Sequence, residues 1–167
     1  MDNFVQLAKT AVETYIRCGE AIVPPDPLPL AMKEQAGVFV SLKKEGRLRG
    51  CIGTFLPEKE NIAEEIIANA IRAATLDHRF PPIKEVELAT IDYTVDLLSP
   101  PEKCTEDDLD PKQFGLLVEA GERRGLLLPD LPDIITVEEQ LRIARMKAGI
   151  PLKTPVRIYR FTVKRHR

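Results

Sequence analysis

Few residues in this chain of 167 are available for covalent or metal cross-links. Its three cysteines, Cys18, Cys51 and Cys104, form no C-x-x-C pair, and His78 and His166 are the only histidines. This set excludes a typical structural zinc site, and an odd number of thiols favours reduced cysteines. A chain of this length buries about 70% of its unfolded surface and needs no such staple.

Long apolar runs and a strong net charge are also missing. No run approaches the ~18 apolar residues of a membrane span, and the N-terminus lacks the regions of a signal peptide. Lys+Arg 24 against Asp+Glu 26 gives a net charge of −2, which excludes a generic polyanion binder. We therefore expect a cytoplasmic protein without a membrane partner. No P-loop, G-x-G-x-x-G or H-E-x-x-H motif is present.

Prolines, by contrast, are abundant, with 14 against 9 glycines. They make up about 8% of the chain, where about 5% is usual. Disorder would scatter them through polar sequence, whereas here they cluster between apolar segments. The prolines therefore mark the boundaries of structural elements.

Apolar periodicity predicts helices and hairpins between these boundaries. The predicted helices cover residues 3–18, 61–76 and 136–148, the last two opened by capping boxes. The predicted hairpins cover residues 37–54 and 114–128, and further strands cover 90–98 and 156–163. Segregated hairpins and helices favour an α+β fold over a doubly wound sheet.

Two segments of the chain align without a gap at an offset of 75 residues. Nine positions are identical over residues 39–73, where unrelated sequences would share roughly two. We interpret this as a duplicated β-β-α-β unit over residues 38–98 and 113–163; the alternative is a chance match of two hairpins. The whole chain, 1–167, would then be a single compact domain with a cleft at the junction of its two lobes, where ligands tend to bind.

The alignment separates shared features from features of one copy. An Arg-Gly dipeptide occurs in both copies, which indicates a role in folding. Cys51 and Asn69 align with Leu126 and Ala144, so their chemistry belongs to the first copy alone. Cys51 and Asn69 are therefore the better candidates for function.

The segment Leu48–Gly53, LRGCIG, is the densest cluster of special residues. Strand alternation predicts that Arg49, Cys51 and Gly53 share one face, and Gly50 and Gly53 permit close approach by a backbone or ligand. A guanidinium beside Cys51 would lower the thiol pKa and favour a nucleophilic thiolate. The alternative is a small buried cysteine in a tight sheet. No paired histidine base can be assigned.

Polar residues of the second predicted helix and the loop after it are further candidates. Asn69 lies on the inward face of the helix, where its amide would orient a substrate or clamp a loop such as 77–80. Asp77, His78 and Arg79 combine a carboxylate, an imidazole and a guanidinium. His78 is a candidate general base, while Asp77 and Arg79 alternatively form an ion pair that fixes the loop.

Other charged groups are weaker candidates. Arg123 and Arg124, and the basic tail 164–167, are candidate phosphate contacts, but a solvated hairpin and a frayed terminus explain them equally. Asp92 and Asp96 share a strand face at a separation of roughly 13 Å, too far for a catalytic dyad.

Several motifs together resemble the AMMECR domain family, and they follow the family's order along nearly the whole chain. They are LRGCIG (48–53), DHRFPP (77–82), LLSPPE (97–102), RRGLLLP (123–129), KAG (147–149) and YRF (159–161). The chain departs from the family at His78, where proline is usual, and at Asp96, where serine is frequent. A role for His78 is therefore not taken from the family.

The resemblance implies a compact α+β domain of two unequal lobes with a groove that bears LRGCIG. Bacterial and archaeal relatives are called AmmeMemoRadiSam system protein A, which implies linkage to a MEMO-type protein and a radical-SAM enzyme. It supplies no established reaction or cofactor. Whether the protein is an enzyme stays open.

The leading hypothesis is a protein of such a modification pathway. In it Cys51 is a nucleophile or substrate contact, Arg49 activates it or holds an anion, and Asn69 orients a substrate. The residues assigned to substrate binding or to structure are Gly50, Gly53, Asp77, Arg79 and Arg124. One alternative is a non-catalytic adaptor for a partner protein or peptide. Another is nucleic-acid association through an arginine cluster of Arg49, Arg79, Arg123 and Arg124.

Overall fold

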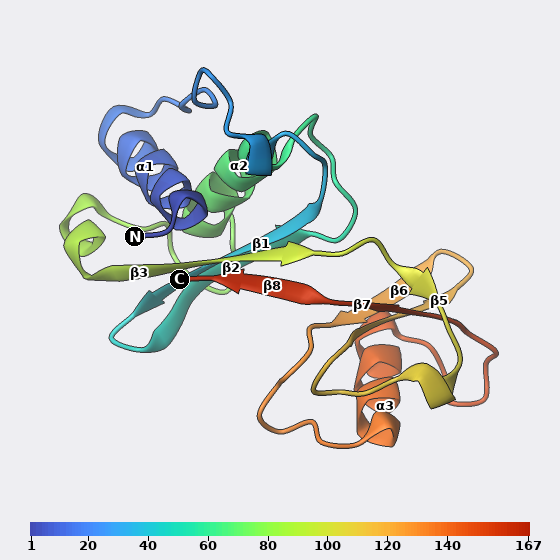
Figure 1. The fold of residues 1–167 in the computed structure, drawn as a ribbon. Helices are drawn as coiled ribbons and strands as arrows, with labels where there is room; N and C mark the ends of the chain where they lie inside the picture. The colour runs from blue at the N-terminus through green and yellow to red at the C-terminus, as the bar shows by residue number, and fades with distance from the viewer. The chain divides into compact units, whose positions relative to one another are not determined.

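A computed structural model describes residues 1–167 (Figure 1). The α-helices are α1 (Asn3–Cys18), α2 (Ile62–Thr75) and α3 (Val137–Ala148), and short 3-10 helices are η1 (Leu30–Met32), η2 (Glu85–Thr90) and η3 (Glu106–Asp108). The strands are β1 (Gly37–Lys44), β2 (Arg47–Thr54), β3 (Ile91–Leu98), β4 (Glu102–Lys103), β5 (Gly115–Ala120), β6 (Arg123–Leu127), β7 (Arg157–Phe161) and β8 (Val163–His166). Two antiparallel sheets with separate helices confirm the predicted α+β class.

The chain divides into two compact units, which we call unit 1 and unit 2. Unit 1 comprises residues 1–98 and 164–167, and unit 2 comprises residues 99–163. None of the helices is both long and apolar enough to cross a bilayer.

The helices of unit 1 end where the local sequence predicts. The Asp2 side chain accepts a hydrogen bond from the Phe4 backbone N–H, and Gly19 closes α1 in the left-handed region with a φ of 72°. Asn61 accepts from the Glu64 N–H at the start of α2. These caps satisfy backbone groups that a helix leaves unpaired.

Unit 1 is a four-stranded sheet in the order β2-β1-β3-β8, with α1 and α2 on one face (Figure 1). Val38, Val40 and Leu42 of β1 are fully buried against the helices. Phe39 and Ser41 alternate with them and lie on the opposite face. Strand β2 forms one edge of the sheet, so its outer backbone groups need other partners.

A β-bulge interrupts the pairing of β1 with β2. Leu42 lies opposite Gly50 and Lys43 lies opposite Leu48, so Arg49 is an extra residue without a partner. Two residues of β2 thus occupy the space of one, and a bulge of this kind redirects side chains. The simple alternation predicted across LRGCIG is wrong at this point.

The basic C-terminal tail forms strand β8 at the edge of the unit 1 sheet, next to β3, so the predicted frayed terminus is wrong. Arg165 donates two hydrogen bonds of 2.8 Å to the Asp96 carboxylate, which is only 2% exposed. The His166 Nδ1 lies 2.8 Å from Asp2 Oδ2, and its ring lies against Phe4. These contacts tie both ends of the chain to unit 1.

Unit 2 is a second four-stranded sheet in the order β4-β7-β5-β6, covered by α3. Thr136 caps the helix by accepting from the Glu139 N–H, and Gly149 ends it with a φ of 68°. Leu116, Val118 and Ala144 form the centre of the core between sheet and helix.

Both units contain a hairpin, a capped helix and a strand that pairs antiparallel with the first strand of the hairpin. This is the order of elements that the internal alignment predicts. The descent of the two units from one duplicated segment stays a prediction, which a superposition of residues 38–75 on 113–150 would test.

The strand pairing corrects the gap-free alignment. Leu42 lies opposite Gly50, whereas Val118 lies opposite Gly125. Each of the two glycines packs against a backbone carbonyl of the helix in its own unit. Val118 is thus the counterpart of Leu42, one residue later than the alignment gives. The bulge residue Arg49 accounts for the difference and has no counterpart in unit 2. Only the glycine of the Arg-Gly dipeptide is a shared structural feature.

Candidate functional site

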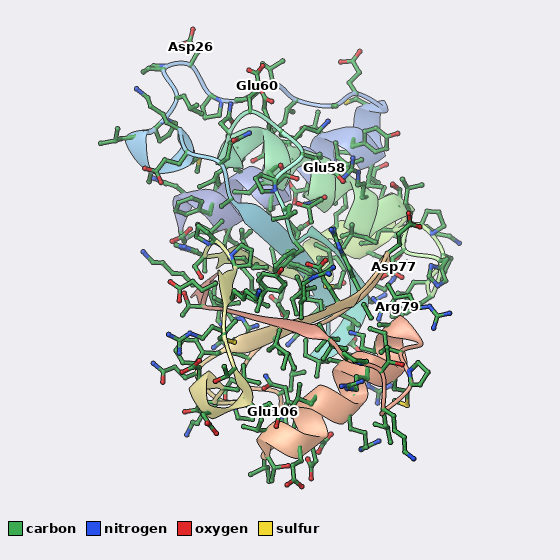
Figure 2. All side chains as sticks on the ribbon, turned by 90° about the vertical axis from the view of Figure 1, so that its right-hand side faces the viewer. Asp26, Glu58, Glu60, Asp77, Arg79 and Glu106 are labelled. Atoms are coloured by element: carbon green, nitrogen blue, oxygen red, sulfur yellow. The ribbon has the colours of Figure 1, made fainter.

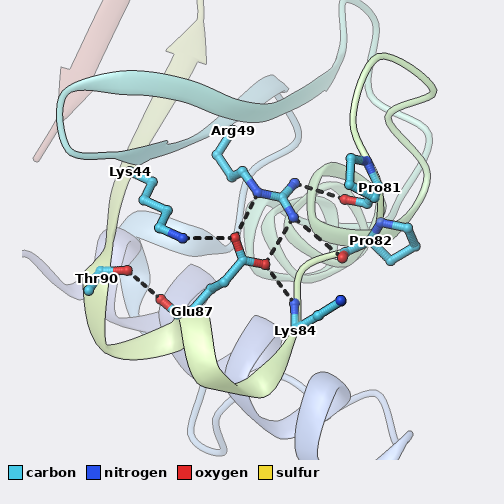
Figure 3. A network of polar contacts seen from close by, with 7 residues as sticks. All are labelled: Lys44, Arg49, Pro81, Pro82, Lys84, Glu87 and Thr90. Atoms are coloured by element: carbon cyan, nitrogen blue, oxygen red, sulfur yellow. Dashed lines mark hydrogen bonds and ion pairs between the residues drawn. The ribbon is translucent and has the colours of Figure 1, made fainter.

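The Arg49 side chain binds the Glu87 carboxylate of η2 (Figure 3). Its Nε and Nη2 donate to the two carboxylate oxygens over 3.1 and 3.0 Å, and Nη1 donates to the Pro81 carbonyl over 2.8 Å. Lys44, on the helix side of β1, also donates to Glu87 over 3.2 Å. Arg49 therefore lies on the helix side of the sheet, and its predicted role as activator of Cys51 is wrong.

The Arg49–Glu87 pair is mostly buried, with the two side chains 13% and 14% exposed. Hydrogen bonds from Arg49, then from the Lys84 backbone, lower the pKa of Glu87 from 4.5 to about 2. The pair fastens the segment that follows α2 to the LRGCIG strand. Its effect is structural.

Cys51 lies on the opposite face of the sheet, with its Sγ 3.3 Å from the Ser41 Oγ of β1. Burial raises the pKa of the Cys51 thiol, and the hydrogen bond to Ser41 and the charge of Arg79 offset this only in part. The thiol is therefore neutral near pH 7, and the predicted thiolate nucleophile is not supported. The nearby guanidinium is that of Arg79.

Asp77 joins the loop after α2 to the open edge of β2. Its Oδ2 accepts from the Cys51 backbone N–H over 3.0 Å and from Arg79 Nη2 over 2.7 Å. The bond from Arg79 is the largest of the effects that hold the pKa of Asp77 well below its usual range. Figure 2 labels both residues, which come from the same loop. The predicted loop-fixing ion pair is confirmed, and the loop blocks the strand edge against further pairing.

The Arg79 side chain is bound to Asp77, and 51% of it stays exposed to solvent. Its Nε donates to Asp77 Oδ1 over 3.0 Å, and its guanidinium lies 5.5 Å from the centre of the Phe80 ring. His78, between the two charged residues, is exposed to solvent. The loop therefore assembles no acid–base pair with Cys51.

Asn69 is fully buried and clamps the first hairpin. Its Nδ2 donates to the Val38 carbonyl over 2.9 Å and to Thr54 Oγ1 over 3.1 Å, while its Oδ1 accepts from Arg72. The predicted partner loop 77–80 is wrong, because the amide binds β1 and β2. With both donors and the acceptor engaged, Asn69 has a structural role.

Glu65, a fully buried carboxylate on the same helix as Asn69, is a further polar residue of the interior that the sequence motifs do not indicate. Glu65 accepts from Thr54 Oγ1 over 2.6 Å and from the backbone N–H groups of Glu58 and Lys59 over 2.9 and 2.8 Å. The signal was present, since Glu65 lies on the inward face of α2 between Ile62 and Asn69. A charged residue on an apolar helix face needs a partner in the interior.

Gly50 and Gly53 are explained by packing. A Cβ on Gly50 would collide with the Ala73 carbonyl of α2, and a Cβ on Gly53 would enter the ring of Phe39. Both glycines thus serve close contact within unit 1. Gly125 has the same function in unit 2, against the Ala144 carbonyl.

The four arginines of the predicted cluster all bind acceptors within their own unit. Arg49, Arg79 and Arg124 pair with Glu87, Asp77 and Glu119, respectively. Arg123 donates to the Gly149 carbonyl over 2.7 Å. Nucleic-acid association stays a prediction, without a group of unpaired guanidinium groups to favour it.

The fold and the site define an α+β protein whose LRGCIG strand is held by the Arg49–Glu87 salt bridge and by the hydrogen bond from the Cys51 N–H to Asp77. The chain belongs to the AMMECR1 family, whose model matches residues 5–166. A Thermotoga maritima protein is 53% identical over 98% of this chain and 97% of its own. A Clostridium acetobutylicum protein is 49% identical over 99% of this chain, which spans only 36% of that protein.

A solved structure has the same fold. The crystal structure of an uncharacterized protein from Pyrococcus horikoshii matches with a TM-score of 0.89 and 35% identity. The match covers 97% of this chain and 88% of the other.

We expect Cys51 to react slowly with iodoacetamide compared with the exposed Cys18. Replacing Arg79 with glutamine is expected to raise the thiol pKa further, because the positive charge of Arg79 favours the thiolate. Replacing Arg49 is expected to leave the pKa unchanged. Alkylation rates measured by mass spectrometry between pH 7 and 10 would test this. A Cys51 that reacts as fast as Cys18 would contradict the assignment.

Proposed function

We propose that the protein works with a MEMO-type protein and a radical-SAM enzyme in a pathway that modifies a macromolecule or metabolite. In this proposal the surface around Cys51 contacts the partner or substrate. The observation that carries the proposal is the polar pair of Ser41 and a neutral Cys51 thiol on the sheet face opposite α1 and α2. Ser41 and Cys51 are only half-buried, so their polar groups stay partly accessible to a partner.

A contact role for Cys51 suits its surroundings better than a nucleophilic role. Its thiol keeps its proton, and the only side chain hydrogen bonded to its sulfur is Ser41, which is not a base at neutral pH. Asp77 fixes the strand through the Cys51 backbone N–H. This fixation lowers the entropy cost of binding a partner.

The Clostridium acetobutylicum relative supports cooperation with another protein module. The present chain matches only 36% of that protein, so most of the relative lies outside the shared part. A family domain that occurs within a longer protein is consistent with a function carried out together with a second module.

A second candidate is a non-catalytic adaptor for a protein or peptide. The half-buried, neutral Cys51 favours it, because an adaptor requires no reactive thiol. The two candidates differ in one measurable respect. A pathway protein acts only together with the MEMO-type protein and the radical-SAM enzyme, whereas an adaptor needs only the protein or peptide that it binds.

The test is binding to the MEMO-type and radical-SAM proteins from the same genome, measured by calorimetry with purified full-length chains. We expect the wild type to bind at least one of them, and Cys51→Phe to weaken binding at least tenfold through steric conflict. Cys18→Ser, an exposed cysteine at the end of α1, is the matched control and should bind like the wild type.

Two outcomes would refute the proposal. One is the absence of binding to either partner. The other is wild-type affinity in a correctly folded Cys51→Phe variant, which would move the contact surface elsewhere. Binding without any effect on the enzymatic activity of the radical-SAM protein would favour the adaptor.

A further inference from the structure

Unit 2 contains a pocket of about 540 Å³ that the proposed function does not use. The turn between β5 and β6, the segment after α3 and the start of β7 form its walls. Its volume lies within the roughly 300–1,000 Å³ of typical small-molecule sites. Cys51 and its neighbours belong to unit 1, so this pocket is a separate feature.

Two guanidinium groups in the pocket keep unused hydrogen-bond donors. Arg123 donates to the Gly149 carbonyl through Nη1, which leaves Nε and Nη2 without a partner. Arg157 reaches Glu119 Oε2 only at 3.5 Å through Nη2, and Glu119 is shared with Arg124. A guanidinium with two adjacent N–H groups presents the geometry that a carboxylate accepts.

The charges around the pocket favour an anionic ligand. The lining residues Arg123 and Arg157 carry two positive charges against the one negative charge of Glu119, which Arg124 outside the lining also contacts. Ile150, immediately past the end of α3, also lines the pocket. The C-terminus of a helix carries a partial negative charge, which opposes a dianion such as a phosphate monoester.

Apolar side chains complete the pocket. Ile150 is 4% exposed and packs into the core of unit 2, and Val156 packs against that core. Both line the pocket together with Pro151 and Pro155. An apolar group of a few carbons would bury surface against them.

We propose that this pocket binds a small monocarboxylate, with its carboxylate on Arg123 and Arg157 and its apolar part against Ile150 and Val156. The proposal is independent of the function proposed for the Cys51 surface. It gives a ligand-binding role to Arg123 of the RRGLLLP segment, which is not part of the Cys51 surface.

Hexanoate is the probe, titrated into the full-length protein and followed by amide NMR shifts. We expect saturable shifts at Ala120, Gly121 and Val156. Hexanamide has the same carbon chain without the charge and should shift none of them. Inorganic phosphate should bind more weakly than hexanoate because of its second charge.

Variants of the two arginines localise the site. Arg157→Gln and Arg123→Gln should each weaken hexanoate binding about tenfold or more, as expected for a lost charge-assisted hydrogen bond. Arg142→Gln changes an exposed arginine of α3 outside the pocket and should bind like the wild type. Arg157 is the more informative position, because its side chain is 51% exposed and the fold depends little on it.

Three results would overturn the proposal. They are shifts of equal size with hexanamide, tighter binding of phosphate than of hexanoate, and wild-type affinity in Arg157→Gln. Thermal unfolding of each variant shows whether a loss of binding reflects a loss of fold. A loss of binding in an unfolded Arg123→Gln alone would not count as support.

Discussion

Gly50→Ala is expected to destabilise unit 1 by about 3 kcal/mol, at the upper end of the usual cost of overpacking. The added Cβ would collide with the Ala73 carbonyl oxygen, which belongs to the backbone of α2. A backbone collision has no rotamer change to relieve it, so β2 and α2 must separate. The measurement is urea unfolding combined with hydrogen exchange of the α2 amides, which reports on unit 1.

Gly53→Ala is the matched control for this prediction, on the same strand three residues away. Its Cβ would meet the ring of Phe39, a half-buried side chain that can rotate away. We expect a cost of about 1 kcal/mol, at the low end of overpacking. Equal costs for the two variants would show that α2 yields as readily as a side chain and would contradict the packing argument.

The local sequence predicted the elements well because their signals lie within a few residues. The caps of α2 and α3, Asn61 and Thr136, act on N–H groups three residues ahead. The turn of the first hairpin is equally local, since Glu45 and Gly46 both have positive φ. Such signals require no knowledge of the rest of the fold.

The bulge at Arg49 was not predicted, because the alternation of side chains between the two sheet faces was inferred from the sequence of one strand only. The register of β2 also depends on β1, and a single extra residue turns Arg49 from the face of Cys51 to that of Glu87. Glu87 is 38 residues away in sequence, so no local pattern indicates this partner. The predicted thiolate is not supported for a different reason, because burial raises the pKa of the Cys51 thiol more than the nearby charge of Arg79 lowers it.

Other parts of the candidate site depend on equally distant contacts. The tail becomes a strand because Arg165 finds Asp96, 69 residues away. Asn69 was correctly placed facing inward by helical periodicity, but its partner Val38 is 31 residues away. Periodicity thus predicts which side of an element a residue occupies, and tertiary structure decides what it binds.

Arg49→Gln is expected to destabilise unit 1 by about 3 kcal/mol, the low end of the usual cost of breaking a buried ion pair, because Lys44 still donates to Glu87. Glu87 would keep its charge in a site where its own side chain is only 14% exposed. Arg49→Lys should recover little, because an ammonium cannot donate to Glu87 and to the Pro81 and Pro82 carbonyls in the fork that Arg49 uses. Urea unfolding at pH 7 is the measurement.

The control is Arg124→Gln, which breaks a pair with Glu119 whose arginine side chain is 58% exposed. Its cost should stay below about 1 kcal/mol, because solvent screens exposed pairs. A cost for Arg49→Gln no larger than this would contradict the buried role. The comparison also tests the corrected alignment, in which Arg49 and Arg124 are not equivalent.

The same ion pair predicts how stability depends on pH. The pKa of Glu87 falls from 4.5 to about 2 on folding, so its contribution is fully present above pH 4.5 and is lost as the pH falls toward 2. The difference in unfolding free energy between wild type and Arg49→Gln should therefore be constant from pH 7 to 5 and shrink below 4.5. A difference that stays constant down to pH 2.5 would assign the lost stability to the packing of the Arg49 side chain, because packing does not titrate.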